Sequence, residues 1–354
     1  MGIDFFKHNE TYRLQQYNPP DPLIDEPVET EEGGEGEKEA NLDYETPRAK
    51  WEPIPLNMFS HWKTSEWENR PVRFVDGKDV GETVAWLCSP TGYPVPVRLS
   101  QIGSVVMRVV DGECRRDFHV VERVVSMASD LFPWDQVENL AIGLQAHGFR
   151  LLNALPDGNK PSDDFERMRK AADNKTMNEM TELEEAALAQ NSDVPTVVDG
   201  RLEPRSEGFH HEDSPAFGVI KTPRKLYMHP QGVRMLYQQL EVGQRTPAFT
   251  LTYPTEHRRL PVITWFVRIA GGRAMPSWGF IRVEASLKWF QKHKLGEDFI
   301  NHLSRTVYEY RCRESSYDRA PVSLHPIVRG EQSLGSLLIP MSTLKSQFYR
   351  LTGL

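Results

Sequence analysis

The sequence predicts an α/β protein that is built on a mixed β-sheet, and two observations carry this prediction. Three apolar, β-branched segments follow one another closely between residues 72 and 110. Beyond residue 160, helical patterns alternate with single short strands. Strands in direct succession favour antiparallel pairing, whereas a strand, a helix and a strand favour a parallel crossover. A sheet with both kinds of pairing, flanked by helices, satisfies both patterns.

Composition limits the class of protein. The chain has 354 residues, of which 39% are hydrophobic and 26% are charged, as in a soluble globular protein with a full-sized core. We find no apolar run long enough to cross a membrane, no signal-peptide pattern and no Gly-x-x-x-x-Gly-Lys-Ser/Thr motif of a nucleotide-driven motor. Three dispersed cysteines suit a reducing compartment. We therefore expect a cytoplasmic protein without a membrane partner.

Charge divides the chain into an N-terminal arm at residues 1–24, an acidic linker at 25–49 and a body at 50–354. Residues 25–45 hold ten acidic residues and one lysine, although the whole chain carries a net charge of only −8. Such a segment is expected to be disordered. It either acts as a solubilising tail or mimics nucleic acid to shield a basic groove. The aromatic residues from Trp51 to Trp67 predict a docked segment or a surface for a partner.

The body opens with three expected strands. The first covers residues 72–76 and closes on Asp76-Gly77, the second covers 83–88, and the third covers 104–110. Asp111-Gly112 after the third strand is typical of a hairpin turn. Helices are expected at residues 120–131 and 134–152.

The second half of the body alternates more regularly. A long helix is expected at residues 163–190, followed by a buried strand that ends at Asp199-Gly200. A short strand is expected at 216–220 and a pair of strands at 260–269 and 278–285. Helices are expected at 295–313 and from about 327 to 349.

Two carboxylates at strand exits form the first candidate site. A single Asp-Gly is usually a turn, but Asp76 and Asp199 follow two similar strands and could hold a divalent metal between them. On the long helix, Glu179 and Glu182 are neighbours, so either one could complete the site. The alternative is a solvated acidic helix face.

Basic residues form the second candidate site. Lys221 follows the strand at 216–220 and would lie at the same end of the sheet as the two aspartates, where it could contact a phosphate. Arg224 and Lys225 follow it, and Arg268 and Arg282 lie in the later strand pair. We expect these four residues to bind DNA locally, because the body outside the acidic segment is nearly neutral. The alternative is ordinary surface charge.

The order of the motifs resembles that of the NurA nuclease family. An early Val-Asp-Gly is followed by an acidic helix, Val-Val-Asp-Gly-Arg-Leu, Gly-Val-Ile-Lys-Thr, Phe-Val-Arg and Ile-Arg-Val-Glu. A late Arg-Ala-Pro-Val-Ser-Leu-His-Pro-Ile completes the series, which spans about residues 70–345. No single motif is specific, but their order and spacing are. The acidic segment before residue 50 has no counterpart in this pattern.

The resemblance implies an RNase H-like fold, a homodimer with a DNA channel, and cleavage of DNA with Mn²⁺ (or Mg²⁺). It also implies partnership with a HerA-type hexameric ATPase, in DNA repair or in antiviral defence against phage. Asp76 and Asp199 match the family's metal-binding aspartates, Glu179 or Glu182 its helical glutamate, and Asp318 or His325 its late ligand. The alternative is a catalytically silent DNA-binding or scaffolding subunit. A hydrolase of small phosphate esters is a third hypothesis.

Overall fold

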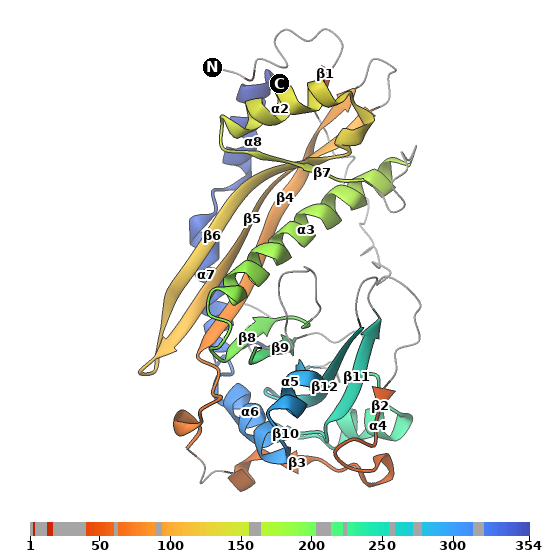
Figure 1. Cartoon of the computed structure of the whole chain (residues 1–354), viewed down its shortest axis with the longest axis vertical. Helices are drawn as coiled ribbons and strands as arrows, with labels where there is room; N and C mark the ends of the chain where they lie inside the picture. Colours follow the sequence, from red (N-terminus) through yellow and green to blue (C-terminus); the bar gives the residue numbers. More distant parts are fainter. Residues whose placement is uncertain are drawn as a thin grey trace.

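One large mixed β-sheet with helices on both faces organises the chain, as the computed structural model shows (Figure 1). The structure describes residues 3, 13–16, 40–59, 63–88, 94–155, 164–202, 214–221, 225–254, 259–271, 278–313 and 322–354. The main strand order is β2-β11-β12-β13-β9-β8-β4-β5-β6-β7. The predicted α/β class with a mixed sheet is confirmed.

The strands are β1 (Arg13–Gln16), β2 (Ala40–Asn41), β3 (Ile54–Pro55), β4 (Arg73–Cys88), β5 (Pro94–Val110), β6 (Glu113–Met127), β7 (Arg150–Asn153), β8 (Thr196–Asp199), β9 (Ala216–Ile220), β10 (Gln244–Arg245), β11 (Phe249–Pro254), β12 (Arg259–Arg268) and β13 (Phe280–Ser286). The α-helices are α2 (Trp134–Gln145), α3 (Phe165–Ala189), α4 (Pro230–Gln238), α5 (Leu287–Lys292), α6 (Glu297–Glu309), α7 (His325–Leu337) and α8 (Met341–Thr352). Among the described residues, no helix is both long and apolar enough to span a bilayer.

Three long antiparallel strands, β4, β5 and β6, form the upper half of the sheet in Figure 1. Asp111 and Gly112 both have positive φ, as the predicted hairpin between β5 and β6 requires. Two predictions here are wrong. Asp76 lies inside the continuous strand β4 rather than at a strand exit. Residues 120–127 continue strand β6 rather than forming a helix, because alternating contacts with β5 outweigh their local helical pattern.

Three parallel strands, β4, β8 and β9, form the centre of the sheet. The ladder between β4 and β8 covers only three pairs and ends at Val75 and Val198. Beyond this point the two strands separate, and Gly200 has φ of 117°, a conformation that favours glycine and ends β8. Asp76 and Asp199 therefore flank the position where the central sheet opens.

Helices α3 and α7 pack on opposite faces of β4. A Cβ atom added to Gly77 would lie 2.6 Å from Glu184 Oε1 of α3. A Cβ atom at Gly330 of α7 would lie 3.7 Å from Asp76 Cβ. Because neighbouring residues of a strand point to opposite faces, Asp76 faces α7 and Gly77 faces α3. The predicted long helix is confirmed as α3, and the expected terminal helix is two helices, α7 and α8.

Part of the expected acidic linker is folded. β2 pairs with β11, and the Glu45 carboxylate binds the buried Arg245 guanidinium at 2.7 and 3.0 Å. Glu45 also accepts a hydrogen bond from the Ala248 backbone N–H. Residues 40–49 therefore belong to the body, because a buried arginine requires the carboxylate. Residues 25–39 lie outside the described residues.

The aromatic segment after the linker packs on the body as well. Trp51 is 4% exposed and packs against Phe249, and the Trp67 ring lies 5.3 Å from that of Phe299. These two rings are therefore not a free docking surface, which corrects one of the two expectations for this segment. In the N-terminal arm, Ile3 is buried and β1 pairs with β4. Trp62 lies outside the described residues.

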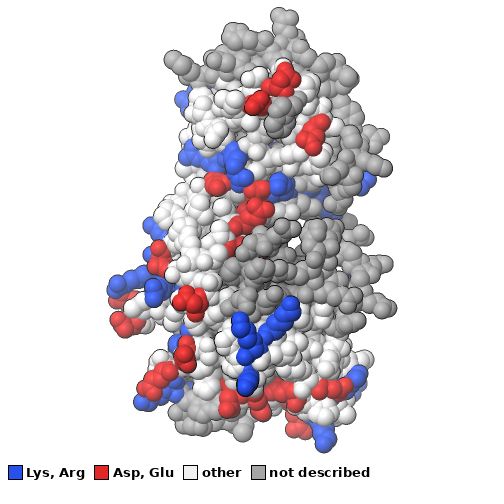
Figure 2. Space-filling model, viewed as in Figure 1, with Lys and Arg blue, Asp and Glu red and all other residues white. Residues whose placement is uncertain are grey.

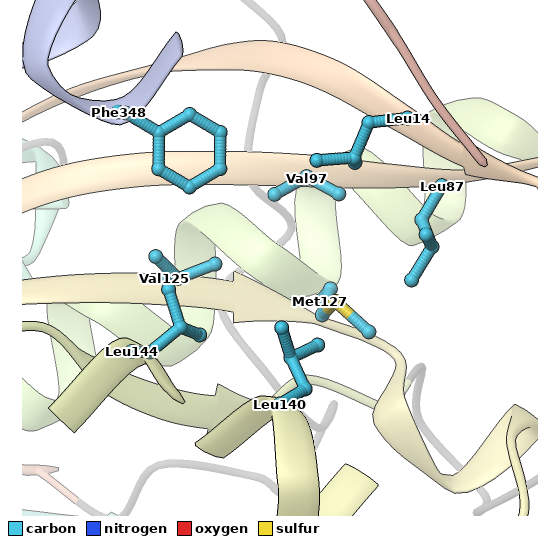
Figure 3. Close-up of a pocket in the computed structure, with 8 residues that line it drawn as sticks. All are labelled: Leu14, Leu87, Val97, Val125, Met127, Leu140, Leu144 and Phe348. Carbon is cyan, nitrogen blue, oxygen red and sulfur yellow. The ribbon is translucent and has the colours of Figure 1, made fainter. Parts of the chain in front are cut away.

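A second apolar core lies at the top of the molecule, between the ends of β4–β6 and helices α2 and α8. It encloses a cavity of about 10 Å³ that is lined only by apolar side chains, among them Leu14, Leu140 and Phe348 (Figure 3). A space of this size holds at most one water molecule and offers it no polar partner. This cavity therefore belongs to a packing core.

Candidate metal centre

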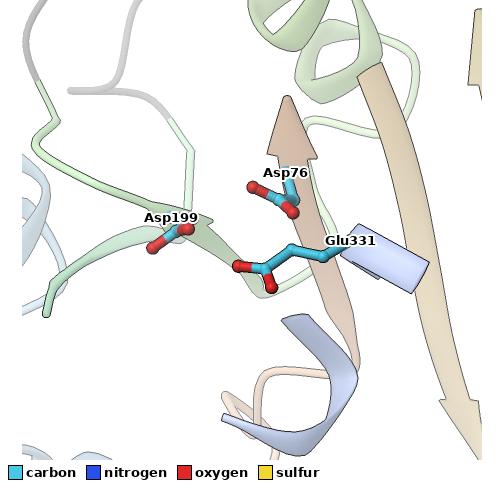
Figure 4. A group of neighbouring side chains, drawn as sticks. All are labelled: Asp76, Asp199 and Glu331. Atoms are coloured by element: carbon cyan, nitrogen blue, oxygen red, sulfur yellow. The ribbon is translucent and has the colours of Figure 1, made fainter. Parts of the chain in front are cut away.

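Three carboxylates from three separate elements meet where the central sheet opens. Asp76 of β4, Asp199 of β8 and Glu331 of α7 each place one oxygen within 4.8 Å of the others (Figure 4). The sequence brings Glu331 here because Gly330 lets α7 approach Val105, Met107 and Asp76 closely. The structure thus brings the two predicted aspartates together.

Lys221 provides the positive charge that the structure shows in this cluster. Its Nζ lies 2.8 Å from Asp199 Oδ2 and 3.0 Å from Glu331 Oε1. It directly follows β9, which runs parallel to β8, so the two strands deliver Asp199 and Lys221 to the same end. Burial alone would lower the pKa of Lys221, but the charges of Asp199 and Glu331 raise it. The ammonium is therefore held in its charged form.

Among the described residues, the ion pairs of the three carboxylates that the structure shows are those with the single ammonium of Lys221. Burial, and then the charge of Asp199, raise the pKa of Asp76 well above its ordinary value. Burial also raises the pKa of Asp199, against the lowering effect of Lys221 and of a hydrogen bond with Asp76. Two adjacent carboxylates cannot both ionise at low cost, so without a cation this arrangement favours a proton on one of them. A divalent cation would take over the role of that proton.

A second observation points to a ligand. Asp76 is only 6% exposed, and its Oδ2 has no hydrogen-bond partner among the described residues. A buried carboxylate oxygen without a partner costs free energy unless a cation occupies its open side. The donors here are hard carboxylate oxygens, which suit Mg²⁺ or Mn²⁺ better than Zn²⁺. The residues present therefore fit such an ion.

A pocket of about 280 Å³ adjoins the carboxylates on the side of α3. Asp76, Asp199 and Arg201 line one wall, and Met177, Met180, Thr181, Glu184, Glu185 and Leu188 of α3 line the other. Glu184 is the helix carboxylate whose side chain reaches β4, over the bare backbone of Gly77. The site therefore has carboxylates from both faces of the sheet.

Neither of the two predicted helix glutamates reaches this cluster. Glu179 pairs with Arg150 at 2.7 Å and with Lys175 at 2.8 Å. Burial would raise the pKa of Glu179, but the hydrogen bonds from Lys175 and Arg150 lower it. Glu182 is exposed to solvent. The helix glutamate that the structure places next to β4 is Glu184, and its position depends on how α3 lies across β4.

Of the two candidates for the late ligand, the structure describes only His325. His325 accepts a hydrogen bond from Arg329 Nε at 3.2 Å and is not part of the carboxylate cluster. Asp318 lies outside the described residues. Glu331, nearly two turns after His325 on the same helix, is the residue that reaches Asp76 and Asp199. In the sequence, the signal that could have identified Glu331 is the preceding Gly330, because a glycine lets a helix approach a strand closely.

Two of the four predicted DNA contacts are engaged inside the body. Arg282 is 3% exposed, donates to the Lys225 carbonyl at 3.3 Å and stacks on Tyr227. Arg268 donates to the Leu240 carbonyl at 2.7 Å and lies over the Phe280 ring. Because β12 and β13 lie inside the sheet, these guanidinium groups serve its packing. Lys225 is exposed, and Arg224 lies outside the described residues.

Basic and acidic side chains are interspersed on the face of the molecule in Figure 2. Exposed lysines that the prediction did not consider, Lys288, Lys292 and Lys294, lie on α5 and directly after it. Charge on the described part of this face therefore forms local groups rather than one continuous basic surface.

Comparison with known proteins identifies no family. No family model matches the chain, and no curated protein matches it. Among solved structures, the crystal structure of the NurA nuclease from Sulfolobus solfataricus superposes with a TM-score of 0.41 at 9% identity, over 80% of this chain and 83% of that chain. A likeness at this level carries no argument about function.

Proposed function

We propose that this protein is a metal-dependent deoxyribonuclease of the NurA type, which hydrolyses phosphodiester bonds at the Asp76, Asp199 and Glu331 cluster. The observation that carries the proposal is the buried, under-compensated set of carboxylates at the opening of the sheet. The order of sequence motifs from Val-Asp-Gly to the late His-Pro-Ile supports DNA as the substrate.

Each residue of the site has a separate role in the proposed reaction. Asp76, Asp199 and Glu331 would hold the ion, and Glu184, which lines the adjoining pocket, would bind a second ion or its water. Bound Mg²⁺ or Mn²⁺ would supply an activated water and stabilise the leaving oxygen. Once the carboxylates bind metal, the Lys221 ammonium would donate to a non-bridging phosphate oxygen, where negative charge accumulates.

The assembly belongs to the same proposal. An RNase H-like arrangement, a homodimer and a HerA-type hexameric partner follow from the motif resemblance, as do a cytoplasmic setting and a role in DNA repair or antiviral defence. Sedimentation of the purified chain at micromolar concentration tests the homodimer: a single monomeric species would overturn it. Co-sedimentation with a HerA-type ATPase tests the partner.

The catalytic proposal is tested with end-labelled single- and double-stranded DNA. Cleavage is expected with Mn²⁺ or Mg²⁺, and none with EDTA. A thermal shift supplies an independent measure, because saturating metal at about 100 times its Kd stabilises the fold by about 2.7 kcal/mol. Metal binding without cleavage of either DNA would favour the silent DNA-binding subunit. Cleavage of model phosphate esters but not of DNA would favour the small-ester hydrolase.

A further inference from the structure

We infer that the pocket between α3 and the carboxylates binds one unstacked nucleobase beside the scissile phosphate, and that Met177 and Met180 form the wall against which this base packs. The inference rests on the proposed function, because the phosphate is placed by the metal centre. It adds a subsite that the carboxylates alone do not supply.

The face of α3 that lines the pocket changes character along its length. Met177, Met180 or Thr181, Glu184 and Leu188 follow one another at helical spacing, so they form one stripe. At a rise of about 1.5 Å per residue, Met180 and Glu184 lie about 6 Å apart along the helix axis. A deoxyribose joins a charged phosphate to a flat apolar base over a comparable distance. The stripe therefore offers a carboxylate for metal at one end and thioethers for a base at the other.

Exposure singles out these methionines. Met177 is 50% exposed although it is large and apolar, whereas Met180 is partly buried and packs with part of its side chain against Ile102, Val124 and Leu152. By contrast, Met168 of the same helix is 2% exposed and belongs to the packing core. Methionine sulfur packs favourably on aromatic rings and adapts to different shapes, so these two side chains suit all four bases.

The size and charge of the pocket further limit which ligand it can bind. A volume of about 280 Å³ is at the lower end of small-molecule sites, which argues for one nucleotide unit rather than a stacked base pair. Arg201 lines the wall next to Asp199 and brings a positive charge that the carboxylates do not. A nucleotide fits these surfaces together. Its base would pack on the apolar wall, and its flanking phosphates would meet the metal held by the carboxylates and the cationic Arg201.

Methyl NMR tests the subsite directly, without any need for cleavage. The protein is labelled with ¹³C at the methionine methyl groups and loaded with Ca²⁺, which is diamagnetic. Thymidine 5′-monophosphate is expected to shift the methyl signals of Met177 and Met180 upfield through the ring current of the base. The variants Met177→Leu and Met180→Leu assign the signals, and buried Met235 of α4 serves as the internal reference. Deoxyribose 5-phosphate, which lacks a base, is expected to leave both signals nearly in place. Equal shifts with both compounds, or none with either, would overturn the subsite.

A cleavage experiment tests the same subsite in the reaction. An abasic residue is placed in turn on each side of the scissile phosphate of a single-stranded oligonucleotide. At one of the two positions we expect kcat/KM to fall about 2- to 10-fold, the range that sulfur–aromatic contacts support. The double variant Met177→Ala, Met180→Ala is expected to cleave intact and abasic DNA at equal rates, whereas Met235→Leu keeps the discrimination.

The two proposals fail in different ways. No cleavage of any DNA would overturn the proposed function, while the NMR titration would still decide whether a base binds at the methionines. Cleavage that ignores the missing base at both positions would overturn the subsite and leave the nuclease intact. The methionine variant supports the subsite if it no longer discriminates intact from abasic DNA but binds metal with unchanged affinity. A general loss of folding would change both the discrimination and the metal affinity.

Discussion

Two buried groups of charge in this molecule are built in opposite ways. At the Glu45 site, Arg245 donates to Glu45 and to Asn301, and Glu45 also accepts from the Ala248 backbone N–H, so every charge has a matched partner. At the Asp76 site, three carboxylates share one ammonium, and one carboxylate oxygen of Asp76 has no hydrogen-bond partner among the described residues. The first group holds a segment to the body. The second keeps a site ready for a cation, and folding alone gives no reason to retain it.

The difference predicts that removing a carboxylate charge has opposite effects on stability at the two sites. The largest effect on cleavage is expected at Asp76. We expect Asp76→Asn to reduce DNA cleavage by about 10³-fold, or about 4 kcal/mol in activation free energy. In metal-free buffer above the folded-state pKa of Asp76, the same variant is expected to melt at a higher temperature than the wild type, because it removes the buried charge that Asp76 carries there. Activity and Tm that fall together would instead make Asp76 a structural residue.

The pH dependence of stability sharpens this test. Because the pKa of Asp76 is higher in the folded chain than in the unfolded chain, the folded state binds this proton more tightly. The resulting stabilisation is present below the ordinary carboxyl pKa and is lost as the pH rises through the folded-state pKa. Metal-free wild type is therefore expected to lose stability over that interval, and Asp76→Asn to lose less.

At the matched pair, removal of one charge should destabilise the fold. Glu45→Ala leaves the buried Arg245 with neutral acceptors and with the exposed Glu297 at 3.9 Å, and breaking a buried pair in this way costs about 3–5 kcal/mol. Denaturant unfolding measures the loss, and metal affinity should stay unchanged. Glu66→Ala is the control, because its pair with Lys63 is solvent-exposed and is worth about 0–1 kcal/mol. Equal stability of the two variants would contradict the structural role of Glu45.

Gly77→Ala should have an intermediate effect, through the helix carboxylate. The new methyl group would meet Glu184 Oε1 at 2.6 Å and Cδ at 2.9 Å, so the carboxylate has to leave its place over Gly77. We expect cleavage to fall about 10-fold, equivalent to about 1.4 kcal/mol. Gly335→Ala on α7 is the control, because its nearest contact is Lys78 Nζ at 3.8 Å and it should cleave DNA normally. If both variants cleave alike, Glu184 has no part in the site.

The smallest effect on cleavage is expected at Glu179, which lies just over one turn before Glu184 on the same helix. Its carboxylate is matched by Arg150 and Lys175, like that of Glu45 and unlike those of the cluster. We expect Glu179→Gln to change kcat/KM by less than about twofold while it lowers stability by about 1 kcal/mol, the usual net value of a hydrogen bond. Steady-state kinetics and denaturant unfolding check the two parts, and a strong loss of cleavage would return Glu179 to the site.

Local pattern determined most elements of this protein. The helix that became α3, the hairpin at Asp111-Gly112 and the strands β8, β9, β12 and β13 follow from apolar periodicity and turn residues, which act over a few positions. The placement of Asp199 and Lys221 at one end of the sheet also follows, because parallel strands expose their carboxyl ends together.

Tertiary structure decided what local pattern leaves open. β6 was mistaken for a helix because its strand state depends on long pairing with β5. Glu184 reaches β4 only through the angle of α3 on that strand, and Glu331 reaches the carboxylate cluster only through the close approach of α7 at Gly330. Arg245 likewise recruits Glu45 from a segment whose composition alone predicts disorder. In each case the deciding contact joins residues far apart in the chain, and the burial that rewards it exists only once the sheet has formed.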